Sequence, residues 1–157
     1  MEFDVKINSG DLYDYMLAHT FHGAAGIIGS GIGAMILIFG LSQSRWMYIV
    51  AGVILLAYQP CALFVKSKQQ ILANPVFAQP LHYSFEEEAI CVSQGEEKQQ
   101  IAWENVVKVT STNRCIMLYT SPIYASILPR REMGELTTPV IQYISTHVPP
   151  KKVKIRF

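Results

Sequence analysis

The chain has 157 residues and a formal net charge of +1, so it has no overall field that would attract nucleic acid or a strongly acidic partner. Half of the residues are apolar and only 16% are charged, whereas soluble domains average about 25% charged residues. Some stretch of this chain must therefore be depleted of charge, and what remains is enough for one domain of modest size.

The first 20 residues predict a short strand followed by an amphipathic helix. From Phe3 to Ile7, apolar residues alternate with polar ones, which is the period of a half-buried strand. Asn8 or Ser9 can then cap a helix, and Asp11 in its first turn would meet the positive end of the helix dipole. We expect this helix to lead into a membrane segment.

Two charge-free runs follow, and each is long enough to cross a bilayer. No Asp, Glu, Lys or Arg occurs between Asp14 and Arg45, or between Arg45 and Lys66. A helix rises about 1.5 Å per residue, so roughly 20 residues span a hydrocarbon core of about 30 Å. We predict a transmembrane hairpin over residues 21–65, with helices at about 21–41 and 46–65.

Two other interpretations of the runs are weaker. A buried hairpin in a soluble protein would need more surrounding chain than 157 residues provide. A cleaved signal peptide does not fit, because acidic residues precede the first run and the run is longer than a signal sequence needs.

Basic residues near the runs predict the orientation. Lys66 and Lys68 follow the second run and Lys6 precedes the first, against Arg45 alone in the turn. Because basic residues favour the cytoplasmic side, we expect a multi-pass protein of the bacterial inner membrane with both termini in the cytoplasm. The three cysteines have no paired spacing, as expected for reduced thiols there.

Small residues in the first run indicate a packing face. Ala25, Gly29 and Gly33 are spaced by four residues, and Gly26 and Ser30 begin a second row with the same spacing. Such rows let helix backbones approach closely. They can serve packing against the second helix of the same chain, or self-association into a homo-oligomer through the first helix. Both possibilities stay open.

The second run contains Gln59 and Pro60. Proline has no amide hydrogen for the carbonyl of Leu56, so we predict a kink near the cytoplasmic end of this helix. Gln59 is the one strongly polar side chain there. It can mark a functional position, or it can be satisfied by the interface or by the freed carbonyl.

Beyond a linker at residues 66–80, the pattern predicts a β domain at residues 81–148. Gln94–Gly95 and Thr112–Asn113 are expected to form tight turns, because Gly and Asn tolerate positive φ. Thr138 followed by Pro139 begins a helix that closes the domain. Period-two patterns predict six strands, at Leu81–Phe85, Ala89–Ser93, Lys98–Trp103, Val106–Ser111, Arg114–Tyr119 and Tyr124–Leu128.

Charged clusters accompany this domain. The loops of its first strands hold Glu86, Glu87, Glu88, Glu96 and Glu97 with only Lys98, which is typical of a solvated face and unsuited to a phosphate cage. The tail at residues 149–157 alternates basic and apolar residues. It can adhere to an anionic membrane or form an edge strand, pairing with Phe3–Ile7. Its basic residues are Lys151, Lys152, Lys154 and Arg156.

No spacing of residues predicts catalysis or a cofactor. The glycines between Gly29 and Gly33 lack the preceding strand of a dinucleotide-binding loop. His19 and His22 lie one helical turn apart, but no Cys or carboxylate supports them as metal ligands. We therefore expect a protein that is not an enzyme and holds no metal or cofactor.

Three segments resemble the YcxB-like family: Ile101–Val109 (IAWENVVKV), Arg114–Tyr119 (RCIMLY) and Ile127–Met133 (ILPRREM). Members of this family carry two membrane helices followed by a small cytoplasmic domain similar to a bacterial pleckstrin-homology domain. The resemblance implies an α+β membrane protein, with a two-helix transmembrane hairpin and a mostly antiparallel β domain closed by a C-terminal helix. Met133 departs from the pattern, because the family often has an aromatic residue after the basic pair.

Three functions are compatible with these features. The leading hypothesis is a non-enzymatic, membrane-anchored module that binds an unidentified protein partner. The second is an immunity protein that neutralises a membrane-acting toxin, since small two-helix proteins are a common format for such inhibitors. The third is an accessory subunit of a transporter, suggested by Gln59 and Pro60.

Overall fold

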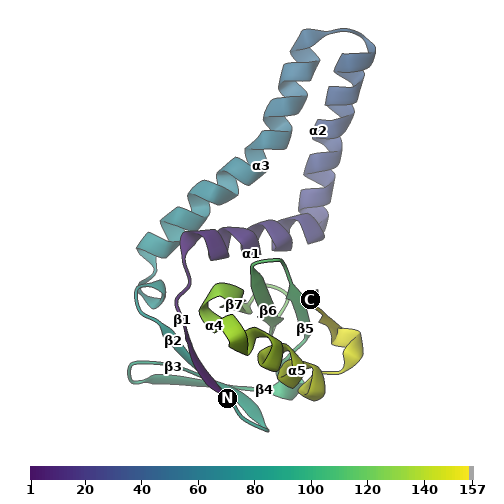
Figure 1. Cartoon of the computed structure of the whole chain (residues 1–157). Helices are drawn as coiled ribbons and strands as arrows, with labels where there is room; N and C mark the ends of the chain where they lie inside the picture. The colour runs from purple at the N-terminus through teal and green to yellow at the C-terminus, as the bar shows by residue number, and fades with distance from the viewer. Residues whose placement is uncertain (156–157) are drawn as a thin grey trace. The chain divides into compact units, whose positions relative to one another are not determined.

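The computed structural model describes residues 1–155, and for Ala25 it describes the backbone alone. The chain forms two compact units. The first, which we call the β domain, combines Met1–Tyr15 with the chain from Ile71 onward, and the second, the helical hairpin, is Met16–Gln70. Figure 1 shows the elements of both units along the chain. The β domain is therefore built from both sides of the hairpin in the sequence.

The first sheet of the β domain joins the N-terminal strand to strands that follow the hairpin. It has the antiparallel order β1-β2-β3-β4, and Val5 of β1 pairs with Leu81 of β2. Gly95, at φ +59°, begins the two-residue loop between β3 and β4, as expected for the predicted turn. The strands are β1 (Glu2–Val5), β2 (Leu81–Phe85), β3 (Ala89–Gln94) and β4 (Glu97–Ala102).

The second sheet contains the motif strands and the C-terminal tail. Its order is β7-β6-β5-β8, antiparallel except that β8 runs parallel to β5. The tail strand therefore pairs with β5, whereas the expected partner, Phe3–Ile7, contributes β1 to the first sheet. The strands are β5 (Lys108–Ser111), β6 (Cys115–Tyr119), β7 (Ala125–Pro129) and β8 (Val153–Lys154).

The predicted α+β fold with antiparallel strands and a C-terminal helix is confirmed, with shifted strand ends. Trp103 lies in the 3-10 turn η2 (Trp103–Asn105), and Val106 and Tyr124 lie outside the strands predicted to begin with them. The turn predicted at Thr112–Asn113 forms without positive φ.

The core of the β domain lies between the sheets and helix α5 (Thr137–His147), whose Val140, Ile141 and Ile144 are buried. All five residues of β6 are buried, and each large apolar side chain there contributes about 1.5–3 kcal/mol. The Nε1–H of Trp103 donates to the carbonyl of Glu86 at 2.9 Å, which satisfies its polar atom within the core.

Two helices form the hairpin, α2 (Ala24–Ser42) and α3 (Trp46–Ala73), and α1 (Ser9–His22) precedes them. The predicted first span at 21–41 is interrupted, because Gly23 adopts extended backbone between α1 and α2. The linker expected from residue 66 is helical as far as Ala73, where Asn74 precedes Pro75, a position that disfavours helical backbone.

Within the described residues, α3 alone is long and apolar enough to cross a membrane, with a mean hydropathy of 2.0 over its best stretch, of which 6% is buried. Helices α1 and α2 satisfy the same criteria only as a pair bent by 76° at the break between them. One membrane helix is thus supported by length and composition, and a second depends on how that pair is counted.

Candidate functional site

Glycines hold α2 and α3 in close contact. A side chain at Gly52 would place its Cβ 2.7 Å from the backbone nitrogen of Leu37, and one at Gly40 would place it 2.7 Å from that of Ile49. Because backbone atoms cannot move aside as a side chain can, these two glycines permit the close approach of the helices.

The first predicted row of small residues also faces α3. A Cβ at Gly33 would lie 3.0 Å from the side chain of Leu56, and one at Gly29 would overlap the amide group of Gln59. Of Ala25, the third member of the row, only the backbone is described. The structure thus places Gly29 and Gly33 at an intramolecular contact.

The second predicted row of small residues, which begins with Gly26 and Ser30, does not lie against a single neighbour. A Cβ at Gly26 would overlap the backbone carbonyl of Thr20 in the same chain, and Ser30 is half-buried. Gly31, between the rows, has no neighbour within 4 Å of a Cβ position. Gly26 is therefore used by its own chain, and Gly31 marks an open face of α2.

The side chain of Gln59 lies at the helix contact. Its Oε1 atom is buried and has no hydrogen-bond donor among the residues that the structure describes. The neighbouring Pro60 lies inside α3 and cannot donate to the carbonyl of Leu56. That freed carbonyl is an acceptor, so it cannot satisfy Oε1.

An ion pair between Asp11 and Arg131, which we call the latch, joins the start of α1 to the segment that follows β7. Asn8 Oδ1 accepts from the amide of Asp11 at 2.9 Å and Asp11 Oδ2 accepts from the amide of Asn8 at 3.0 Å, so the predicted cap is reciprocal. The same Asp11 oxygen forms an ion pair with Arg131 at 2.8 Å. This hydrogen bond is the main reason why the pKa of Arg131 is raised above its ordinary value.

Arg131 also donates to the carbonyl of Lys6 at 2.8 Å and pairs with Glu132, so both of its terminal nitrogens have partners. Beside the latch is a hollow of about 580 Å³, whose lining includes Arg114 and Arg130. Sequence reasoning missed the latch because Asp11 and Arg131 lie 120 residues apart, although Arg131 belongs to the ILPRREM motif.

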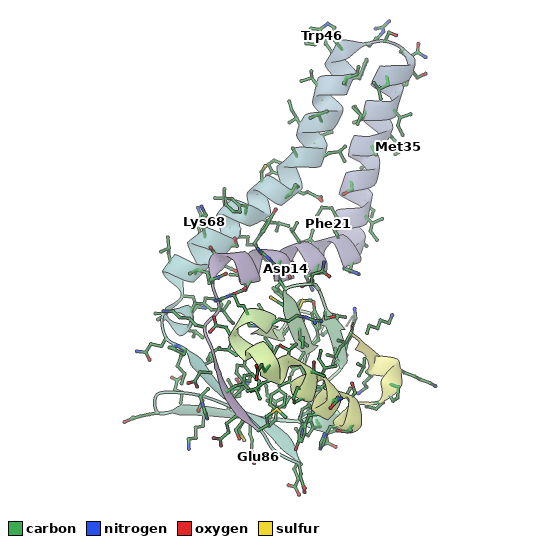
Figure 2. The ribbon with its side chains drawn as sticks, in the orientation of Figure 1. Asp14, Phe21, Met35, Trp46, Lys68 and Glu86 are labelled. Carbon is green, nitrogen blue, oxygen red and sulfur yellow. The ribbon has the colours of Figure 1, made fainter. Side chains whose placement is uncertain are left out.

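The predicted acidic loops lie at opposite ends of strand β3. Figure 2 shows Glu86 at the opposite end of this domain from Asp14 on α1. The three glutamates at 86–88 are exposed in the β2–β3 loop, and Glu96 and Glu97 are exposed at the β3–β4 turn. The structure brings the five carboxylates to the loops that connect the first sheet's neighbouring strands.

Strand β4 is an open edge of the first sheet, where it pairs with β3 among the described strands. The two-residue loop after Gln94 makes Gln94 and Glu97 a hydrogen-bonded pair. Along an antiparallel ladder, such pairs alternate with pairs whose backbone groups point away from the partner strand. The backbone groups of Lys98 and Gln100 therefore point outward from the sheet. Both side chains are exposed as well.

The basic tail is partly fixed in place. Val153 pairs with Val109, and the Lys152 ammonium donates to the carbonyl of Val106 at 2.9 Å. Lys151 and Lys154 are exposed. Arg156, the fourth predicted tail residue, lies outside the described residues.

A further surface, missed from the sequence, lies at the β6–β7 loop. Ile123 is 65% exposed, Tyr124 is 69% exposed, and the nearby Val107 is 52% exposed. Tyr124 was predicted to be part of a strand, and apolar residues that begin a strand do not stand out in a period-two pattern. The signal that could have found this loop is the adjacent Ser121-Pro122, which favours a turn.

The buried titratable groups do not form a reactive centre. Burial raises the pKa of the Cys115 thiol to about 12, and it also raises the pKa of Tyr83 to about 12. A thiol in that state is protonated at neutral pH and a poor nucleophile. His22 Nδ1 lies 2.6 Å from the carbonyl of Ala18, and the described residues contain no group of three or more potential metal ligands.

Comparison with known proteins finds one family that part of the chain matches. Residues 85–137 match the family model described as YcxB-like protein, which confirms the resemblance drawn from the sequence. The matched segment extends from the end of β2 to the start of α5 and includes all three motif segments. No curated protein and no solved structure gives a significant match to the chain.

Proposed function

We propose that this protein is a non-enzymatic, membrane-anchored interaction module of the bacterial inner membrane. Helices α2 and α3 cross the bilayer as a hairpin, both chain ends lie in the cytoplasm, and the β domain binds a protein partner there. The observation that carries the proposal is the contrast between the exposed apolar side chains of the hairpin and the closed core of the β domain.

The hairpin exposes more apolar surface than a soluble protein ordinarily does. Met35 lies on the side of α2 away from α3, and Trp46 lies at the turn end of the hairpin (Figure 2). Contiguous exposed apolar surface of this kind marks contact with lipid or protein. Aromatic residues such as Trp46 and Tyr48 suit the membrane–water interface beside the turn. The exposed large apolar side chains of the two helices include Ile27, Ile28, Ile32, Met35, Ile38, Phe39, Trp46, Met47, Val50, Val53, Ile54 and Leu55.

The topology is tested by labelling single cysteines in a variant whose three native cysteines are replaced by alanine. Gln43→Cys places a thiol in the hairpin turn, and Glu96→Cys places one in the β domain. A membrane-impermeant maleimide should label position 43 in intact spheroplasts, and position 96 only after the membrane is opened. Equal labelling of the two positions in intact spheroplasts would overturn the proposed topology.

The open edge of β4 is the proposed docking surface for the partner. Outward-facing backbone groups at Lys98 and Gln100 can extend the sheet by one strand from another chain. The glutamates at 86–88, 96 and 97 flank this edge, so an extended segment with basic residues is the partner chemistry that it favours.

A photo-reactive residue at position 98 tests this surface in native membranes, with position 135 as a matched exposed control outside β4. We expect a specific protein adduct from position 98 and none from position 135. The variant Gln100→Pro should abolish capture, because proline removes the outward N–H without breaking the bonds to β3, whereas Gln100→Ala should preserve it. Capture that survives Gln100→Pro would exclude strand addition at this edge.

Gln59 favours a second candidate function, that of an accessory subunit of a membrane transporter. Its buried Oε1 has no donor within the described chain, and a polar group in that position within a bilayer is costly unless another helix satisfies it. A photo-reactive residue at position 59 should then capture a multi-span membrane protein. Recovery of the β-domain partner alone would count against this candidate.

A further inference from the structure

The exposed apolar residues Val107, Ile123 and Tyr124 lie together at one end of the second sheet. The amide of Val107 donates to the carbonyl of Tyr119 at 2.8 Å, and Tyr119 pairs with Ala125, the residue after Tyr124. The three side chains therefore occupy neighbouring positions across β5, β6 and β7. We call this surface the apolar tip.

Hydrogen bonds fix the loop that carries the apolar tip. Ser121 Oγ accepts from the amides of Ile123 at 3.2 Å and Tyr124 at 2.9 Å, and the carbonyl of Tyr124 accepts from the amide of Thr120 at 3.1 Å. The loop thus has local polar partners for its backbone, yet its two large apolar side chains remain uncovered. An ordered loop that presents apolar side chains is suited to insert them into another apolar phase.

The position of the apolar tip along the chain indicates which phase that is. The Tyr15 hydroxyl donates to the carbonyl of Ile123 at 3.2 Å, and Tyr15 is the last residue of the β domain before the hairpin. Phe21, where the apolar run begins, is six residues beyond Tyr15, and six residues reach at most roughly 20 Å. If the hairpin crosses the bilayer, the apolar tip is tethered close to the leaflet surface.

Charge around the tip favours an anionic surface. Lys108 follows Val107 and is exposed, and Lys151 and Lys152 approach the same sheet beside β8. The nearby carboxylate of Asp14 accepts a hydrogen bond from the Thr112 hydroxyl. Glu86, in the β2–β3 loop, lies at the opposite end of the domain from Asp14 (Figure 2). The lysines at 108, 151 and 152 thus lie on or beside the sheet that carries the apolar tip, whereas the glutamates at 86–88 lie in a loop of the first sheet.

We propose that Val107, Ile123 and Tyr124 insert into the headgroup region of the anionic inner leaflet and fix the β domain on the membrane, with Lys108 contacting lipid phosphates. Three side chains are too few for a stable protein interface on their own, but tethering makes weak lipid contacts sufficient. Tyrosine suits the interface because its ring is apolar and its hydroxyl reaches water. The proposal rests on the transmembrane hairpin of the proposed function, and it adds an orientation that leaves the β4 edge and the acidic loops accessible.

The test uses the full chain in lipid nanodiscs, in the background without native cysteines. Tyr124→Cys carries an environment-sensitive fluorophore, Glu96→Cys carries the same fluorophore as the control, and the lipids carry a headgroup-region quencher. We expect strong quenching and a blue-shifted emission at position 124, and neither at position 96. Quenching should be stronger in phosphatidylcholine with added phosphatidylglycerol than in phosphatidylcholine alone.

The lysine contribution is measured with Lys108→Gln. A basic residue near an anionic leaflet contributes about 1 kcal/mol, so the ratio of docked to undocked domain should fall about fivefold. A fluorophore at position 107 should also lose its quenching in an Ile123→Ser, Tyr124→Ser variant, whose changes are on the surface and leave the core intact.

Equal emission at positions 124 and 96 would overturn the proposal, and equal quenching in the two lipid mixtures would overturn the assignment of an anionic leaflet. Insertion of the hairpin is measured separately, by maleimide labelling of position 43 in intact spheroplasts. Failure of the apolar tip is thereby distinguished from failure of the membrane anchor.

Discussion

The helical hairpin and the β domain place the same residue types in opposite positions. In the hairpin, glycines such as Gly52 lie at the contact between helices and large apolar side chains such as Ile38 point outward. In the β domain, large side chains such as Ile116 fill the core, and Gly95 lies in an exposed turn. In the proposed membrane setting, the hairpin helices gain nothing from hiding leucine or isoleucine from water, so backbone approach decides their contact, whereas burial decides the fold of the β domain.

The largest effect on the free energy of unfolding is expected when one large apolar side chain is truncated in each unit. Ile116→Ala should lower the free energy of unfolding of the β domain by about 2–5 kcal/mol, because Ile116 is fully buried. Ile38→Ala in α2 should change it little, because Ile38 is exposed. The measurement is denaturant unfolding of the detergent-solubilised protein, followed by Trp103 fluorescence in a Trp46→Phe background. Equal destabilisation by the two substitutions would show that the hairpin and the β domain share one core.

The reverse test adds a methyl group at a glycine in each environment of the hairpin. Gly52→Ala should destabilise the hairpin by about 1–3 kcal/mol, because the new Cβ meets the backbone of Leu37. Gly31→Ala should be neutral or slightly stabilising, because its Cβ has no neighbour within 4 Å and alanine favours helix. Cysteine cross-linking between α2 and α3 in detergent measures the helix contact. Efficient cross-linking in both variants would contradict the glycine-mediated contact.

Much of the β domain could be predicted because its signals are local. Alternation of apolar and polar residues locates β2–β7 within a few residues, and Gly95 marks a turn by its own backbone freedom. The pairing of β1 with β2 could not be predicted, because Val5 and Leu81 are separated by the whole hairpin. The break at Gly23 is hidden within a continuous apolar run, since periodicity does not report a change of helix direction.

The candidate surfaces were harder to predict than the fold. Small-residue spacing draws attention to Gly29 and Gly33, which face α3, but it does not distinguish their partners from those of Gly26. The latch between Asp11 and Arg131 and the apolar tip at Ile123 depend on which strands come together in three dimensions. A single sequence gives no information on such non-local contacts.

The latch offers a smaller effect, which shows how firmly the segment before the hairpin is held by the β domain. Arg131→Gln should lower the unfolding free energy by about 1–2 kcal/mol, because Asp11 stays buried without its cation while the exposure of Arg131 limits the loss. A double-mutant cycle with Asp11→Asn measures the coupling between the two side chains. If the two losses simply add, the ion pair does not stabilise the domain.

The smallest expected effect is a loss of stability at alkaline pH, which should occur in the β domain alone. The folded pKa of Cys115 is raised to about 12 from an ordinary value of 9.0, so the unfolded chain loses this proton first as pH rises. The stability contributed by the neutral thiol is therefore complete below pH 9 and is lost between about pH 9 and 12. Tyr83, with a pKa raised to about 12, adds a similar decline from its ordinary 10.0. The unfolding free energy of Cys115→Ala should fall less steeply with pH over this range than that of the parent protein. Cross-linking between the cysteines introduced in α2 and α3 should not follow the pH profile of the β domain. A parent and variant with identical slopes would show that the Cys115 thiol ionises as readily in the fold as in the unfolded chain, and that the β domain does not exclude water from β6.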